Sequence, residues 1–196
     1  MTTAVAASHS ESLTGVPSNK LGMWLFLASE IMFFTGLIAA YVLLRAGHPA
    51  WPGPEGRLSV PFGTLNTFIL ICSSMTMVMA LPAAQEGRTS ALRMWLALTV
   101  ALGSTFLVIK GIEYSTKFHH GIFPGTNIFW SCYYTLTGFH GLHVLGGIIA
   151  NVCLLLSAMR GRLTPDKAYG VELAGLYWHF VDIVWIFLFP MLYLMT

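Results

Sequence analysis

Five long apolar segments constrain this chain more than any other feature of its sequence. A helix that crosses the apolar core of a bilayer needs about 20 residues, and each segment reaches that length. The segments cover approximately residues 21–44, 64–84, 92–112, 128–158 and 169–196. They are continuous, whereas the strands of a membrane β-barrel would alternate apolar and polar residues. The sequence therefore predicts an all-α fold, an integral membrane bundle of five transmembrane helices.

The composition supports a membrane location. Hydrophobic residues make up 56% of the 196 residues and charged residues only 9%, whereas ordinary globular domains carry roughly 25% charged residues. A soluble fold of this size could not bury so much apolar surface. The net charge of +2 is dispersed and includes no basic cluster, which argues against nucleic acid as a partner.

The ends and gaps of the segments define a simple domain organisation. Residues 1–19 are small and polar and lack the apolar stretch of a signal peptide. We expect them to form a disordered or loosely ordered cytoplasmic tail, followed by a single membrane domain over residues 20–196. Cys72, Cys132 and Cys153 lie inside apolar segments without metal-binding spacing, so we interpret them as packing residues.

The distribution of Lys and Arg predicts an orientation. With five crossings, the side of the N-terminus holds Lys20, Arg88, Arg93, Arg160, Arg162 and Lys167. The opposite side holds Arg45, Arg57, Lys110 and Lys117. Because cytoplasmic loops carry the excess of positive residues, we expect a cytoplasmic N-terminus and a C-terminus on the outer side.

Five ionisable side chains lie near the middle of the predicted spans, where such groups are costly and usually face the bundle interior. They are Glu30 in the first span, His140 and His143 in the fourth, and His179 and Asp182 in the fifth. Each pair is spaced i,i+3 and shares one helix face. Glycines around the fourth-span pair would allow close helix contact. We therefore predict a polar seam of hydrogen bonds between the fourth and fifth spans.

Other interpretations of these residues remain open. Histidines and carboxylates on neighbouring helices could form a metal site, although one of the two pairs is all-histidine. They could also form a proton relay of a stand-alone transporter, but the halves show no inverted repeat. Polar contacts that fix helix packing are the interpretation we favour for the seam. Glu30 differs, because no basic residue lies three or four positions away.

A second polar pair lies near the outer end of the third span. Lys110 and Glu113 are also spaced i,i+3. We expect them to form a local pair on the helix surface, which contributes a few tenths of a kcal/mol, about 0.2–0.5.

The sequence strings that hold these residues resemble a known family. They are GMWLFLASEIMFFTGLIAAYVLLR, LNTFILICSS, KGIEY, TGFHGLHVLGG and YWHFVDIVWIFLF, in this order along the chain. Together they resemble subunit III of haem–copper oxidases, specifically of cytochrome c oxidases, in a five-helix bacterial form. The resemblance covers nearly everything from Leu21 to Thr196.

The resemblance implies an accessory role in a proton-pumping oxidase of the bacterial inner membrane. Such a subunit packs on subunit I, supports proton uptake and protects against turnover-linked inactivation. It has no catalytic residue, metal or redox centre of its own, because haem and copper belong to subunits I and II. Glu30 matches the family's carbodiimide-reactive carboxyl. Structural phospholipids and a larger respiratory supercomplex are further partners that the family suggests.

Some features depart from the family's usual pattern. Many members have seven helices, and their lipid cleft lies between the first two and the rest, whereas this sequence matches from the third onward. Five-helix relatives also occur with quinol oxidases and with nitric oxide reductase. Ser29-Glu30 favours the cytochrome c oxidase form, since quinol-oxidase versions usually have Ser-Asp there, whereas Phe189-Pro190 is nearer the nitric-oxide-reductase relative.

Overall fold

Five long helices make up nearly all of the described structure, a computed structural model that covers residues 17–54 and 58–195. The helices are α1 (Ser18–Gly47), α2 (Val60–Gln85), α3 (Thr89–His119), α4 (Ile128–Met159) and α5 (Tyr169–Phe189). A short 3₁₀ turn, η1 (Pro165–Lys167), precedes α5, and a π-turn, η2 (Pro190–Leu194), follows it. The described residues contain no strand, so the predicted all-α fold with five membrane-length helices is confirmed.

α1–α4 extend beyond the predicted segments, whereas α5 ends at Phe189, before the predicted end at residue 196. α3 continues to His119 rather than ending near residue 112. Its last turns are polar but remain helical, because Lys117 forms a hydrogen bond with Glu113 inside the protein. α1 begins at Ser18, so the last residues of the predicted tail are helical. The rest of that tail, residues 1–16, lies outside the described residues.

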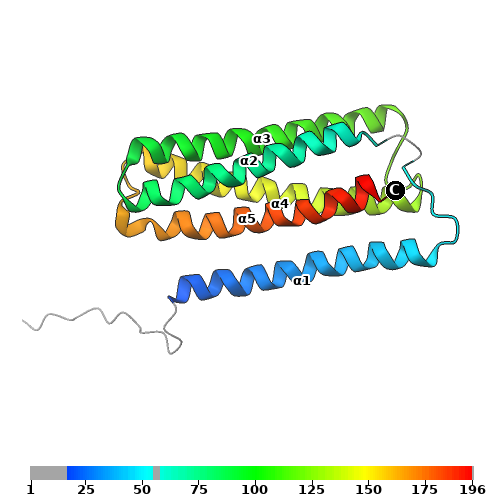
Figure 1. Cartoon of the computed structure of the whole chain (residues 1–196), viewed down its shortest axis with the longest axis horizontal. Helices are drawn as coiled ribbons and strands as arrows, with labels where there is room; N and C mark the ends of the chain where they lie inside the picture. The colour runs from blue at the N-terminus through cyan, green and yellow to red at the C-terminus, as the bar shows by residue number, and fades with distance from the viewer. Residues whose placement is uncertain (1–16, 55–57, 196) are drawn as a thin grey trace, which may run out of the picture.

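Four helices form a bundle, and α1 lies alongside it. α2 packs against α3 and α5, and α4 packs against the same two helices. α1 lies along the outside of this bundle, next to α5, and also contacts α4 (Figure 1). Only Phe34 and Tyr41 of α1 are buried. The first helix therefore contributes little to the core, which lies among α2–α5.

Trp178 of α5 fills the centre of the bundle, where glycines leave room for its ring. A Cβ added to Gly103 of α3 or to Gly147 of α4 would lie 2.6 Å from the Trp178 ring. The indole Nε1–H donates a hydrogen bond to Ser73 Oγ of α2 at 3.1 Å. One side chain thus contacts three helices, and the small residues of α3 and α4 allow them to approach it closely.

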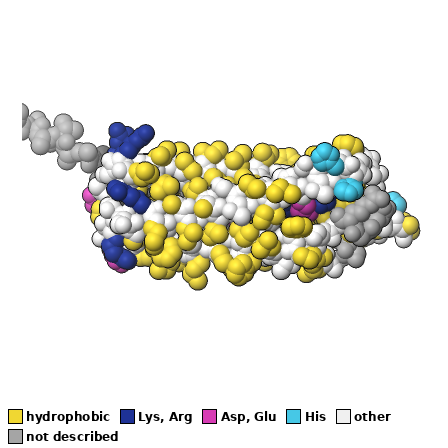
Figure 2. Space-filling view, turned by 90° about the horizontal axis from the view of Figure 1, so that it is seen from above, with side chains coloured by type: hydrophobic (Ala, Val, Ile, Leu, Met, Phe, Trp, Pro, Cys, Tyr) yellow, Lys and Arg dark blue, Asp and Glu magenta, His cyan; other side chains and the backbone are white. Residues whose placement is uncertain are grey.

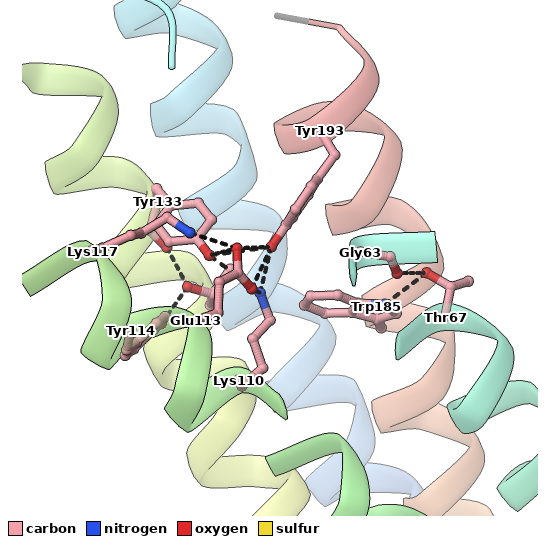
Figure 3. A network of polar contacts seen from close by, with 10 residues as sticks. Gly63, Thr67, Lys110, Glu113, Tyr114, Lys117, Tyr133, Trp185 and Tyr193 are labelled. Atoms are coloured by element: carbon pink, nitrogen blue, oxygen red, sulfur yellow. Dashed lines mark hydrogen bonds and ion pairs between the residues drawn. The ribbon is translucent and has the colours of Figure 1, made fainter. Parts of the chain in front are cut away.

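Pro190 determines how the chain ends. Proline has no N–H to continue the α-helical bonding pattern, and the backbone widens into η2 directly after α5. Tyr193, on this turn, is 2% exposed and points back into the bundle toward α3 (Figure 3). The turn therefore supplies a hydroxyl to a polar network that sequence spacing did not predict.

Candidate functional site

Glu30 of α1 and His143 of α4 form a contact at membrane depth. Glu30 Oε2 lies 2.9 Å from His143 Nε2, and the two side chains are 19% and 18% exposed. The other ring nitrogen, Nδ1, lies 2.7 Å from the carbonyl oxygen of Phe139. The distant partner that Glu30 lacked along its own helix is therefore a histidine three helices later.

These two contacts determine how many protons the pair holds. A carbonyl oxygen only accepts hydrogen bonds, so Nδ1 of His143 must carry a proton. If the ring is neutral, Nε2 is an acceptor and the Glu30 carboxyl must donate to it. If the ring is charged, Nε2–H donates to a carboxylate. In both cases one proton lies between Glu30 and His143, and the pair is neutral overall.

Aromatic rings surround this pair. The ring of Phe34 meets that of His143 edge-on at 5.0 Å between centroids, and Phe33 stacks on it at 6.3 Å. The Tyr177 hydroxyl donates to the His143 carbonyl oxygen at 3.0 Å. The apolar surroundings strengthen the contact, because few other polar groups compete for the proton.

Two further polar contacts hold α1 against the bundle, one on each side of Glu30 along the helix. Near its start, Lys20 forms an ion pair with Glu172 of α5. Near its end, the Tyr41 hydroxyl donates to the carbonyl oxygen of Met191 at 3.3 Å. The Glu30–His143 pair is thus the middle of three polar contacts that join α1 to the C-terminal half of the chain.

The predicted polar seam between α4 and α5 does not form as expected. His140 is fully buried, stacks on Trp185 with centroids 5.0 Å apart, and has no hydrogen-bond partner among the described residues. His179 instead contacts α2, with its Nδ1 2.7 Å from Ser74 Oγ. Asp182 is 4% exposed, one turn further along α5.

The packing of Trp178 explains this difference. Its ring occupies the glycine face of α4. Successive residues of a helix are rotated by about 100°, so His179 points away from that face. α5 does pack against these glycines, as predicted, but the side chain that contacts them is Trp178 rather than His179 or Asp182.

Lys110 and Glu113 belong to a buried network rather than to the helix surface, which corrects the second prediction. Lys110 and Glu113 are 7% and 8% exposed, and Lys110 Nζ donates to Glu113 Oε2 at 2.9 Å. Lys117, also on α3, donates to Glu113 Oε1 at 2.6 Å. The hydroxyls of Tyr133 and Tyr193 donate to the same oxygen, each at 2.9 Å (Figure 3).

The sequence contained only part of the signal for this network. The i,i+3 and i,i+4 spacings place both lysines beside Glu113, but Tyr133 and Tyr193 come from α4 and η2, and no spacing rule joins them to α3. The described residues contain no group of three or more His, Cys, Asp or Glu side chains that could hold a metal ion.

The fold and its polar sites define a class of protein, a multi-pass helical membrane protein whose buried ionisable groups bond across its helices. The family model for cytochrome c oxidase subunit III matches residues 3–196. The chain belongs to the cytochrome c oxidase subunit III family, as its sequence motifs predicted, and is an accessory subunit of the cytochrome-c oxidase complex.

Individual relatives agree with this assignment. The cytochrome c oxidase subunit 3 of Thermostichus vulcanus is 41% identical over 197 residues, which cover 99% of this chain and 94% of the relative. That of Synechocystis sp. is 42% identical over 89% of this chain and 74% of the relative. A probable cytochrome c oxidase subunit 3 of Nocardia farcinica is 38% identical over 98% of both chains.

Proposed function

We propose that this chain packs against subunits I and II, which would hold the haem and copper, and that it supports their proton uptake and protects them from inactivation during turnover. The Glu30–His143 pair is the observation that carries this proposal. The pair shares one proton, which can occupy either the Glu30 carboxyl or the His143 ring. The proton can therefore shift in response to nearby charge while the net charge of the pair stays the same.

The location of the pair fits such a role. Both side chains are partly exposed, although they lie in the membrane-spanning part of α1 and α4. Ionisable groups at this depth are usually functional, because holding them there is costly. A neighbouring subunit or a lipid that covered the α1–α4 side would change the surroundings of the proton directly.

We also propose that a phospholipid chain lies between α1 and α5. A cavity of about 490 Å³ separates these helices. Its lining is almost wholly apolar and includes Leu27, Ile31, Phe34, Phe180, Ile183 and Phe187. Because α1 contributes few buried residues, an acyl chain would fill space that protein side chains leave open.

The proposed membrane is the bacterial inner membrane, with the N-terminus in the cytoplasm. Lys and Arg side chains gather at one end of the face shown in Figure 2. Most Lys and Arg residues of the chain lie at or next to the start of α1 and the turns between α2 and α3 and between α4 and α5. The positive-inside rule places that end on the cytoplasmic side.

Glu30→Gln in the intact oxidase tests the proposed role. The glutamine amide can still donate to His143 Nε2 but cannot release a proton, so we expect normal assembly and retained oxygen reduction. The number of turnovers before inactivation should fall several-fold, on the order of a 1 kcal/mol change. Ser29→Ala, next to Glu30, is the control. Complete loss of oxygen reduction would contradict an accessory role, and unchanged proton uptake and inactivation would contradict a role for this pair.

A further inference from the structure

The buried network of α3 contains more positive than negative charge. Lys110 and Lys117 are both buried beside Glu113, the one carboxylate of the network. Both oxygens of that carboxylate already accept hydrogen bonds from the two lysines and from Tyr193. With both ammonium groups protonated, one positive charge remains without a counter-charge among the described residues of the network. A buried charge is stable only when it is paired.

The two lysines differ in how many of their ammonium N–H groups have a hydrogen-bond acceptor. Lys110 Nζ donates to Glu113, Tyr133 and Tyr193, which accounts for all three N–H groups of an ammonium. Lys117 Nζ donates only to Glu113 among the described residues, although Lys117 is 5% exposed. Lys117 Nζ also lies 5.7 Å and 5.1 Å from the ring centroids of Trp130 and Tyr133, but these rings supply no anionic oxygen, so two of its N–H donors remain without an acceptor among the described residues.

Lys117 lies where two cavities meet. One, of about 190 Å³, is lined by Ser59, Phe62, Ile109, Ile112, Glu113, Thr116 and Lys117. The other, of about 320 Å³, is lined by Thr116, Lys117, His120 and Ile122. Both have room for a group that accepts hydrogen bonds from the Lys117 ammonium.

The start of α2 adds to the attraction for an anion. Ser59 is the N-cap residue of α2 and its side chain makes no capping hydrogen bond, although it lines the first cavity. Pro61 has no N–H and Gly63 N–H donates to the Ser59 carbonyl oxygen, so the free N–H groups of this first turn are those of Val60 and Phe62, and the helix dipole is positive at this end. Lys117 and the α2 N-terminus thus present positive potential to the same cavity.

The rest of the lining suits a hydrocarbon chain. Phe62 and Ile112 are 51% and 60% exposed and, with Ile109, form the apolar wall of the cavity. Lys117 is two residues from the end of α3. A helix of 31 residues is about 46 Å long and exceeds the apolar core of a bilayer, about 30 Å. Lys117 is therefore at the level of lipid headgroups.

We propose that Lys117 binds the phosphate of a phospholipid whose acyl chain lies against Phe62, Ile109 and Ile112. The phosphate supplies the negative charge and the acceptors that the network lacks. This site is at the end of α3 and the start of α2, and is separate from the cavity between α1 and α5. Inorganic phosphate offers the same headgroup chemistry without the chain, so the test must distinguish the two.

Native mass spectrometry of the detergent-solubilised oxidase complex can count bound phospholipid and identify inorganic phosphate by mass. We expect Lys117→Gln to lose one retained phospholipid per complex. Lys117→Arg, which keeps the charge, and Lys167→Gln, which removes a charge at the other end of the bundle, should retain it. Unchanged retention in Lys117→Gln would overturn the site. Loss of inorganic phosphate alone would overturn the assignment to lipid.

A second measurement does not depend on the folding of a variant. The wild-type complex is irradiated with a phospholipid that carries a photoreactive diazirine on its acyl chain, and the labelled peptides are mapped. We expect labelling of the α3 segment with Ile109 and Ile112. Labelling of α1 and α5 without this segment would overturn the proposed position of the chain.

Discussion

Glu30 and His143 are 113 positions apart in the sequence, yet Glu30 Oε2 lies 2.9 Å from His143 Nε2. Helical spacing showed that no basic residue lies within one turn of Glu30 on its own helix. It could not identify the partner, since spacing predicts which residues share a face and not which face meets another helix. The same limit explains why the sequence identified the individual polar residues of the spans but paired them wrongly in the predicted seam.

The strength of this pair can be measured by a double-mutant cycle with Glu30→Leu and His143→Leu, which each remove the hydrogen bond. We expect a coupling energy of about 0.5–3 kcal/mol, the range for residues that share a hydrogen bond. Thermal unfolding of the purified complex provides the four stabilities. Additive effects would mean that the two side chains do not interact, and the cycle for Glu30→Leu with Glu86→Leu serves as the non-contacting control.

Glu113 should be far more sensitive than an exposed carboxylate. Glu113→Gln leaves two buried ammonium groups without a carboxylate, and we expect a loss of about 3–5 kcal/mol in the free energy of unfolding. Glu86, whose ion pair with Arg88 is more than half exposed, is the matched control. Its change to Gln should cost at most about 1 kcal/mol. Similar melting temperatures for the two variants would show that the network is not stabilising.

At the scale of the helices, length and composition were sufficient to predict the elements, whereas their ends depended on tertiary contacts. The apolar segments located all five helices, because the bilayer requires continuous apolar runs of that length. They placed the end of α3 too early, because Lys117 is polar in sequence but bonds to Glu113 within the bundle. The glycines of α4 indicated a close contact with another helix, but they did not indicate which side chain would occupy the space beside them.

Gly147→Ala tests how closely α4 and α5 pack. An added Cβ would lie 2.6 Å from Trp178, so α5 or the indole ring must move, and we expect a cost of about 1–3 kcal/mol. Gly138→Ala on the same helix, with no heavy atom within 4 Å of its Cβ, should be neutral or slightly stabilising. Thermal melting of the two variants separates the effects. Equal stability would mean that Trp178 adapts without cost.

At the scale of the whole molecule, the sequence predicted the membrane fold and the family, whereas the position of α1 required the structure. α1 is as apolar as its neighbours, and nothing in its composition indicates that it lies beside the bundle rather than within it. Its exposed side chains, which include Trp24, Leu25, Met32 and Leu43, need lipid or a partner subunit to cover them.

The orientation of the molecule is open to a direct test with single cysteines. Thr126 lies before α4 and Asp166 precedes α5, and both are exposed at opposite ends of the bundle. We expect a membrane-impermeant maleimide to label Thr126→Cys in intact cells and to label Asp166→Cys only after the membrane is opened. The reverse pattern would invert the proposed topology.

The three polar contacts of α1 also determine when this helix can reach its final position. Of the five described helices α1 is translated first, yet its partners His143, Glu172 and Met191 all lie in the last two long helices or in the turn that follows them. During synthesis, α1 therefore enters the bilayer before its partners exist, and it can form these three contacts only after almost the whole chain has been translated. A chain truncated before α4 would leave Glu30 in the lipid without its histidine partner.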